Sequence, residues 1–456
     1  MRFFLCFVAI LSISIIQLQS QRVYTFDEYY NQIVTANPLV LEAKYEITAA
    51  EAELFGARGL FDPILSGGFN LKTQNAKDKL NDLDLSLEIP FASMFGPKVK
   101  AQMRRAVAES TNPADRTSSP FDASIGVSLP LGQGIFTDEK RNKLFQAEIK
   151  PQIGQAKFQE KRNKILVEAL SLYWKWAESY QQVQIAQNLV TIAQERAQQL
   201  RDRATAGDIA AMDSLEANLE VVFRNGKLLE KQQAYEQASV NLQVFVWDNN
   251  QQQTPLPGIP ESFQTVVKLS EQEIQSAQND AKLLRPEVKL LQLDRNLANL
   301  DLNLANEFLR PNINANLDLM MYGLSDVGPG NLKFGLTMSQ PILFRQARSQ
   351  EELANIGIKR IDLQALQMDA FVTADVNFYA TAVNRTYEQI QFLKTEVSLA
   401  SQLLNFERER LVAGETSLFL VNQRERFLAT SQEKLAKEQS NYFIALIYLR
   451  WARGTI

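Results

Sequence analysis

The sequence predicts a mainly α-helical protein that also contains a membrane β-sheet and is internally duplicated. Three observations predict this class. Long stretches are rich in Gln, Ala, Glu, Lys, Arg and Leu and nearly free of glycine and proline. Shorter segments alternate strictly between apolar and polar residues. Two sets of landmarks recur in the two halves of the chain, in the same order.

Residues 1–20 are the first element, and they indicate a secretory signal peptide. Arg2 precedes an apolar run of about 14 residues, which is short of the roughly 20 that a membrane-spanning helix needs. A signal cleaved near Ser20 is therefore favoured over a membrane anchor. Cys6, the one cysteine of the chain, lies inside this segment, so we expect a mature chain without disulfides or thiolate metal sites.

The composition argues against several classes of function. The 48 Lys and Arg residues and the 52 Asp and Glu residues leave a net charge of -4 without a basic tract, so there is no electrostatic case for nucleic acid. The chain has no histidine, the commonest general base and metal ligand, and no phosphate-binding loop of the Walker A kind. We therefore expect no enzyme, no cofactor and no bound metal.

The first structural repeat is predicted over residues 21–247. It opens with a helix that ends at the Asp62-Pro63 pair, because proline favours a break there. A later helical stretch has a kink expected at Pro151 and ends at Gly207, a residue type that favours the left-handed end of a helix. The predicted elements after the first helix are strands 64–73 and 122–131, a long helix over 137–204 and a return helix over 209–247.

The long helix is expected to be far longer than a globular domain is wide. At 1.5 Å per residue it spans on the order of 100 Å. Such a helix cannot bury its apolar stripe inside a globule, so it must pack along other helices as a coiled coil. A cytoskeletal or spacer coiled coil is the simplest alternative, but the signal peptide and the strands argue against it.

An insertion between the two strands of the first repeat carries a further alternating pattern. Within residues 83–104, LDLSLEI alternates well and KVKAQMR alternates weakly, with PFASMFGP between them. This segment either forms an extra hairpin in the sheet, which gives six strands per chain, or folds as a loop outside it. We favour the hairpin in the sheet.

The second structural repeat is predicted over residues 271–456, after a polar, proline-rich segment at 248–270 that is either a linker or an equatorial segment on the side of the molecule. The Arg310-Pro311 pair precedes the same alternation as in the first half, and Gly414 occupies the position of the first glycine turn. The predicted elements are an opening helix, strands 312–322 and 331–340, a long helix over 344–411 and a return helix over 417–451.

The alternating segments indicate strands that cross a bilayer, because each has about the 9 to 11 residues that a tilted membrane strand needs. In a soluble sandwich the same pattern would place one face on a core and the other in water. The strands are too few and the helices too long for that. We expect the apolar face to contact lipid and the polar face to line an aqueous lumen, in a barrel that several chains close together. The expected lipid-facing residues are Leu65, Phe69, Leu71, Ile313, Leu317, Leu319, Phe334 and Leu336.

The duplicated order of elements and two strand-to-helix junctions resemble the TolC-like outer-membrane efflux family. The junctions are VSLPLGQG at 127–134 and TMSQPILF at 337–344. The resemblance implies a trimeric β-barrel in the outer membrane of a Gram-negative bacterium, continued into the periplasm by a long antiparallel α-helical coiled-coil barrel. With the insertion in the wall, a trimer would hold ~18 strands rather than ~12.

The resemblance also implies the partners. The chain would form a homotrimer in outer-membrane lipid and dock onto a periplasmic adaptor (membrane fusion) protein. The adaptor would couple it to an inner-membrane pump of the RND or ABC type. No nucleic acid is expected. The residues implied in docking lie at the two tip turns and are Arg203, Gly207, Leu215, Arg410, Gly414 and Val421.

A gate at the tips is implied by the same resemblance. The family closes its tips with a polar network, and Asp213 matches one of its aspartates. In the second half, Leu420 and Gln423 occupy positions where the family often has aspartate, so the usual acidic gate is incomplete. Glu216, one turn from Asp213, is the candidate replacement; the simpler interpretation is a solvated helix residue.

The expected function is a passive exit duct of a tripartite efflux or type I secretion system, with the energy supplied by the pump. The alternative is a soluble periplasmic coiled-coil scaffold or adaptor, which would wash off membranes without detergent. An enzyme that uses acidic pairs such as Asp213 and Glu216 ranks third, because no pocket is indicated around them. A wide aqueous lumen selects weakly, so the sequence does not identify the cargo.

Overall fold

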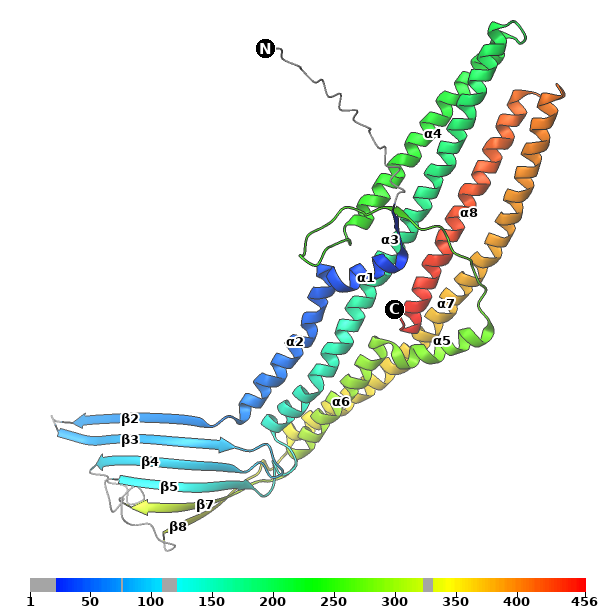
Figure 1. The fold of residues 1–456 in the computed structure, drawn as a ribbon. Helices are drawn as coiled ribbons and strands as arrows, with labels where there is room; N and C mark the ends of the chain where they lie inside the picture. The colour runs from blue at the N-terminus through cyan, green and yellow to red at the C-terminus, as the bar shows by residue number, and fades with distance from the viewer. Residues whose placement is uncertain (1–21, 75–76, 109–120, 323–330) are drawn as a thin grey trace, which may run out of the picture.

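Figure 1 shows an elongated chain with a β-sheet at one end and long helices that lead away from it to two tip turns. The structure is a computed structural model, and it describes residues 22–74, 77–108, 121–322 and 331–456. The signal peptide expected at residues 1–20 lies outside the described residues.

Six strands form one antiparallel sheet in the order β2-β3-β4-β5-β7-β8. Each of the four strands predicted outside the insertion starts and ends within one residue of the observed strand. The segment 83–104 spans the end of β3, a turn and the start of β4, so the insertion contributes two strands that lie between β2 and β5. The strands are β2 (Ile64–Gln74), β3 (Lys77–Pro90), β4 (Lys98–Ala108), β5 (Phe121–Pro130), β7 (Asn312–Tyr322) and β8 (Leu332–Ser339).

The long helices follow from high helix propensity and from defined ends. The Asp138 carboxylate accepts hydrogen bonds from the backbone N–H groups of Lys140 and Arg141 at 2.9 and 3.0 Å, which caps the start of α3. The helix then continues through Pro151 without ending. None of the described helices is long and apolar enough to cross a membrane. The helices are α1 (Phe26–Ala36), α2 (Pro38–Arg58), α3 (Glu139–Thr205), α4 (Ala211–Gln243), α5 (Glu271–Leu284), α6 (Pro286–Glu307), α7 (Arg345–Val412) and α8 (Leu418–Arg453).

The helices form a single curved layer that is four helices wide. Near the tips the neighbours are α4-α3-α8-α7, and nearer the sheet they are α2-α3-α6-α7. The helices α3 and α7 therefore run through the whole layer, as Figure 1 shows. Because α4 and α2 lie on one side and α7 lies on the other, the layer has two lateral edges.

The aromatic core lies at mid-length, where the two helical levels meet. Trp174 stacks on Phe443 with ring centroids 4.2 Å apart, and Tyr173 is fully buried. The two-residue strands β1 (Val23–Tyr24) and β6 (Ile259–Pro260) pair in parallel beside this core. Of the two interpretations of the segment 248–270, a linker or an equatorial segment, the second fits better, because the segment contributes a paired strand and core contacts.

Candidate membrane wall and helical tips

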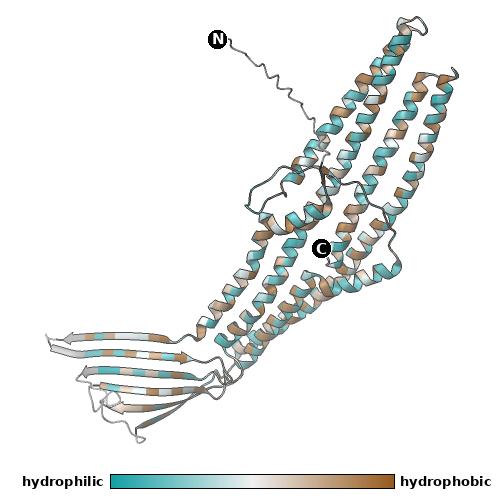
Figure 2. Ribbon diagram, in the orientation of Figure 1, coloured by the Kyte–Doolittle hydropathy of each residue, from teal (hydrophilic) through white to brown (hydrophobic). Residues whose placement is uncertain are grey.

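One face of the sheet is mainly apolar across all six strands, with Arg105 sharing it near the end of the sheet that is farther from the helices. Residues that stand opposite each other on paired strands share a face, so the register places Leu65, Leu87, Ala101, Ile125, Leu319 and Leu332 in one row. The next row contains Ile89, Val99, Val127, Leu317 and Phe334. The register thus brings the lipid-facing residues predicted from both halves of the chain onto one surface, and Figure 2 shows the alternation along the strands.

This apolar face is largely uncovered in the single chain. The side chains of Leu65, Phe69 and Phe334 are 76%, 63% and 69% exposed. Leu71, Leu317 and Leu336 are also exposed, and Ile313 and Leu319 are partly exposed. A continuous apolar surface of this kind marks a site that is covered by lipid or by another protein.

The opposite face of the sheet carries charges and amides. The Arg104 guanidinium donates to the Asp82 carboxylate at 2.9 Å, and the Gln102 amide donates to Asp84 at 2.8 Å. On the neighbouring strands, a Cβ at Gly126 would lie 1.8 Å from an Asp318 carboxylate oxygen. The glycine therefore gives the Asp318 side chain room to lie across the polar face.

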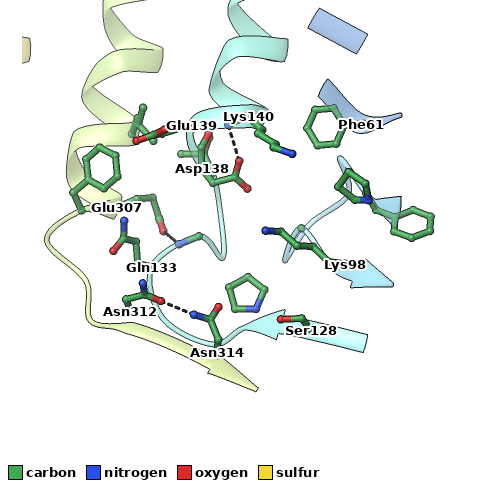
Figure 3. A pocket seen from close by; sticks show the side chains of 18 residues that line it. Phe61, Lys98, Ser128, Gln133, Asp138, Glu139, Lys140, Glu307, Asn312 and Asn314 are labelled. Atoms are coloured by element: carbon green, nitrogen blue, oxygen red, sulfur yellow. Dashed lines mark hydrogen bonds between the residues drawn. The ribbon is translucent and has the colours of Figure 1, made fainter. Parts of the chain in front are cut away.

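The junction between sheet and helices is held by two buried charged residues. Figure 3 shows the cavity at this junction, about 350 Å³ in volume, with Glu307 accepting a hydrogen bond from the backbone N–H of Gly134 at 3.0 Å. Arg141, which is 1% exposed, donates to the carbonyl oxygens of Ser93 and Ile135 at 3.3 and 3.2 Å. These bonds tie the β3-β4 turn and the strand-to-helix connection to the start of α3.

The two tip turns lie where the sequence predicts them. Gly207 and Gly414 follow α3 and α7 with φ values of +81° and +76°, the left-handed conformation that favours glycine. Arg203 and Arg410 are exposed in the last turns of these helices. Leu215 is 72% exposed on α4. Val421, by contrast, is fully buried in the helical layer and presents no surface to a partner.

An ion cluster with a buried centre lies behind the tips and joins all four helices of the layer. We call it the tip-side ion cluster; it contains Arg196 of α3, Glu220 and Arg224 of α4, Arg408 of α7, and Glu425 and Arg426 of α8. Glu425 is 1% exposed and accepts hydrogen bonds from Arg224 at 2.7 Å, from Arg408 at 2.8 Å and from Arg196. Glu220 accepts from Arg224 at 2.8 Å and from Arg426.

The arginines keep the Glu425 carboxyl ionised in spite of its burial. Burial alone would raise the pKa of this carboxyl, but the hydrogen bonds and charge of Arg196, together with Arg408 and Arg224, lower the pKa from 4.5 to about 2. The pKa of Glu220 is lowered in the same way, because Arg426 and Arg224 outweigh its desolvation. Since removing one partner of a buried ion pair is costly, the cluster holds the α3-α4 and α7-α8 hairpins together.

The predicted gate residues stand apart from this cluster. Asp213 is exposed in the first turn of α4, and Glu216 is partly exposed one turn later. Among the described residues, neither carboxylate takes part in an ion pair. The tip-side ion cluster was missed from the sequence, although the Glu220 and Arg224 pair at helical i, i+4 spacing is a signal that is visible there.

The described residues hold no group of three or more carboxylate, cysteine or histidine side chains placed to bind a metal ion. The features described above are the two faces of the sheet, the exposed tips and the tip-side ion cluster that joins the two helical hairpins. The sheet presents one mainly apolar and one polar face, and the ion pairs of the cluster connect the α3-α4 and α7-α8 hairpins.

Comparisons with known proteins agree with this architecture. The sequence pattern of the outer membrane efflux protein family matches residues 29–246. No curated protein sequence matches the chain. The solved CmeC outer membrane channel of Campylobacter jejuni has a TM-score of 0.64 with this chain, at 12% identity, over 94% of this chain and 85% of CmeC.

Two further solved structures share the fold. The outer membrane protein VceC of Vibrio cholerae has a TM-score of 0.63 at 13% identity, over 94% of this chain and 96% of VceC. The MtrE outer membrane channel of Neisseria gonorrhoeae, in its open state, has a TM-score of 0.61 at 14% identity, over 94% of this chain and 88% of MtrE. At these identities the likeness concerns the fold.

Proposed function

We propose that the chain is a member of the outer membrane efflux protein family, whose sequence pattern matches residues 29–246, and that it is the passive exit duct of a tripartite efflux or type I secretion system. It is an outer-membrane protein that extends into the periplasm. The observation that carries the proposal is the sheet, whose six strands present one exposed apolar face and one polar face. A closed ring of such sheets has lipid outside and water inside.

The two lateral edges of the chain support ring closure by several copies. The strand β2 forms one edge of the sheet and β8 forms the other, and each pairs with a single neighbour among the described strands. Pairing β2 of one copy with β8 of the next removes both edges. Such a head-to-tail contact generates a ring when the rotation closes, and the family resemblance supports three copies.

The helical edges carry matching apolar stripes. Both stripes have heptad-like spacing, start within about two turns of their tip and cover a similar length of helix. They lie on opposite edges of the layer, so α4 of one copy fits beside α7 of the next. The exposed residues are Leu215, Leu219, Val222 and Leu229 on α4, and Phe392, Leu399, Leu403 and Phe406 on α7.

The two halves of the chain support an internal duplication. Each half has an opening helix, antiparallel strands, a long helix, a glycine turn and a return helix, in this order. The second half lacks counterparts of β3 and β4 among its described residues. The insertion thus distinguishes the two repeats.

The exposed tips support docking to a periplasmic adaptor protein that connects the duct to an RND or ABC pump. The exposed docking candidates are Arg203, Gly207, Leu215, Arg410 and Gly414. Three copies would bring Asp213 and Glu216 into a ring of negative charge at the tip, which supports a gating role. The pump supplies the energy, because the sequence carries no Walker A loop.

A soluble periplasmic scaffold accounts less well for the sheet, since it leaves the apolar face in water. Extraction and native mass test the two functions. We expect the protein to stay with outer membranes through carbonate and urea washes, and to be released by detergent as a trimer. Release by the washes as a monomer would overturn the duct in favour of the scaffold.

A further inference from the structure

We propose that β3 and β4 are wall strands that widen the membrane section of the duct to the width of its helical section. The duct then has a lumen of about 25 Å at the membrane, without narrowing there, and this lumen sets the upper limit on the width of the cargo. This inference rests on the proposed function, and it deepens that function by assigning the size class of the cargo.

The hydrogen bonds place the hairpin within the wall. The strand β4 pairs with β3 on one side and with β5 on the other, from Lys98–Ser128 to Arg105–Phe121. A hairpin that folded outside the wall would leave β2 paired with β5. In this chain the two strands are instead separated by the hairpin.

The faces of the hairpin continue those of the sheet. Leu85 and Met103 stand opposite each other on the apolar side, between Gly67 of β2 and Ala123 of β5. The hydrogen-bonded Asp84 and Gln102 lie on the polar side. A hairpin exposed to water on both faces has no need for this sidedness.

The hairpin is also bonded into the junction with the helices. The backbone N–H of Phe95, in the β3-β4 turn, donates to the carbonyl oxygen of Ile135 at 3.1 Å. The buried Arg141 joins the same turn to the start of α3. A Cβ at Gly96 would lie 3.2 Å from the Arg141 guanidinium carbon, so the turn is closely fitted to this side chain. The β3-β4 turn is therefore bonded to the sheet-side end of the helical layer and is not a free loop.

The width of a six-stranded sheet matches that of the helical layer. Strands about 4.8 Å apart and tilted by about 40° each occupy about 6 Å of a barrel's circumference, so six strands cover about 37 Å. Four helices packed 8–10 Å apart cover about 36 Å. Four strands would cover only about 25 Å, and the duct would taper sharply at the membrane.

In a ring of three copies, the width of each sheet determines the diameter of the lumen. A ring with three six-stranded sheets has a backbone radius of about 18 Å, against about 12 Å for three four-stranded sheets. Side chains about 5 Å deep leave a lumen of about 25 Å in the first case and about 14 Å in the second. An α-helix is about 10–12 Å wide with its side chains, so the wider lumen admits a polypeptide hairpin as well as small solutes.

Distances between spin labels on neighbouring copies test the inference. The only native cysteine is Cys6, so Ser128→Cys and Val127→Cys place one label each on the polar and the apolar face of β5 once the Cys6 segment is removed or replaced. In a three-fold ring, the distance between equivalent backbone positions is about 30 Å for the wider barrel and about 20 Å for the narrower one. We expect about 30 Å, with Ser128 labels closer together than Val127 labels.

The possible outcomes separate the two proposals. An inter-copy distance near 20 Å, with the Ser128 labels still closer together than the Val127 labels, would contradict the wider barrel but not the duct. A Ser128 distance longer than the Val127 distance, or no inter-copy distance in a folded sample, would overturn the duct itself. Ser124→Cys is the matched control, because it lies on the same face nearer the other end of β5; a cylinder predicts the same distance as at Ser128.

Discussion

The sheet and the tip-side end of the helical layer place charge in opposite positions. In the sheet, most charged side chains lie on one open face, and the other open face is mainly apolar. Behind the tips, the central charges of the ion cluster, those of Glu220, Arg224 and Glu425, lie inside the layer, and the exposed stripes at its edges are apolar. This difference is the one expected if, as proposed, the sheet separates lipid from water, whereas the helical layer has water on both faces and packs its apolar edges against neighbouring copies.

The largest expected effect comes from a charge on the apolar face. Leu317→Arg places a cation against lipid, which costs about 2–4 kcal/mol per copy in a membrane barrel, and we expect the detergent-resistant oligomer to be lost. Asn316→Arg, on the adjacent polar face, keeps the cation in water and should preserve the oligomer. Native gel mobility of both variants measures whether the oligomer is lost or preserved. Equal loss in the two variants would contradict the assignment of the faces.

The second effect concerns Glu425, the buried carboxylate at the centre of the tip-side ion cluster. Glu425→Gln leaves Arg196, Arg224 and Arg408 without their shared carboxylate, and we expect it to lower the free energy of unfolding by about 3 kcal/mol. Glu415→Gln is the control, since Glu415 is exposed and lies 3.8 Å from Arg410. It should change stability by less than about 0.5 kcal/mol. Urea unfolding of the detergent-solubilised protein measures both, and similar losses would argue against a brace.

A third effect is a pH dependence carried by the same carboxyl. The folded-state pKa of Glu425 lies below its ordinary value, at about 2 instead of 4.5. The stability that it contributes is therefore complete above about pH 4.5 and is lost as the pH falls toward 2. The difference in unfolding free energy between the native protein and Glu425→Gln should shrink over this window. A difference that stays constant with pH would show that the charge of Glu425 is not what holds the cluster.

The smallest effect is the change in stability when alanine replaces a glycine of a tip turn or a glycine inside a helix. Gly414 has φ +76° and open space around a would-be Cβ, so Gly414→Ala should destabilise the tip by about 1 kcal/mol through backbone strain alone. Gly226 also has open space around its would-be Cβ but lies inside α4, where alanine is the better helix former. Gly226→Ala should stabilise by up to about 1 kcal/mol, and thermal unfolding of both variants tests the opposite signs.

Much of the fold follows from local pattern. The ends of α3 and α7 lie within two residues of the predicted ends, because the helical stretch is bounded by turn residues such as Gly207 and Gly414. The strands are equally well located, since strict alternation of apolar and polar residues marks where each of them begins and ends. The insertion at 83–104 was expected in the sheet, and it forms part of β3 and β4.

The parts that the sequence did not predict depend on contacts between distant segments. Pairing of β1 with β6 joins residues that are far apart in the chain, so the segment 248–270 had only the composition of a linker. Glu425 becomes a brace only because α3, α4 and α7 bring arginines to it. Val421 was assigned to a docking tip by its position in the turn, but helix packing buries it.

The central claim is that the apolar face of the sheet contacts hydrocarbon and the polar face contacts water. A membrane-impermeant maleimide applied to opened outer membranes tests it on two adjacent residues, Leu317→Cys and Asn316→Cys. The account predicts rapid labelling at position 316 and protection at position 317 until detergent or denaturant is added. Rapid labelling of both positions in intact membranes would contradict it.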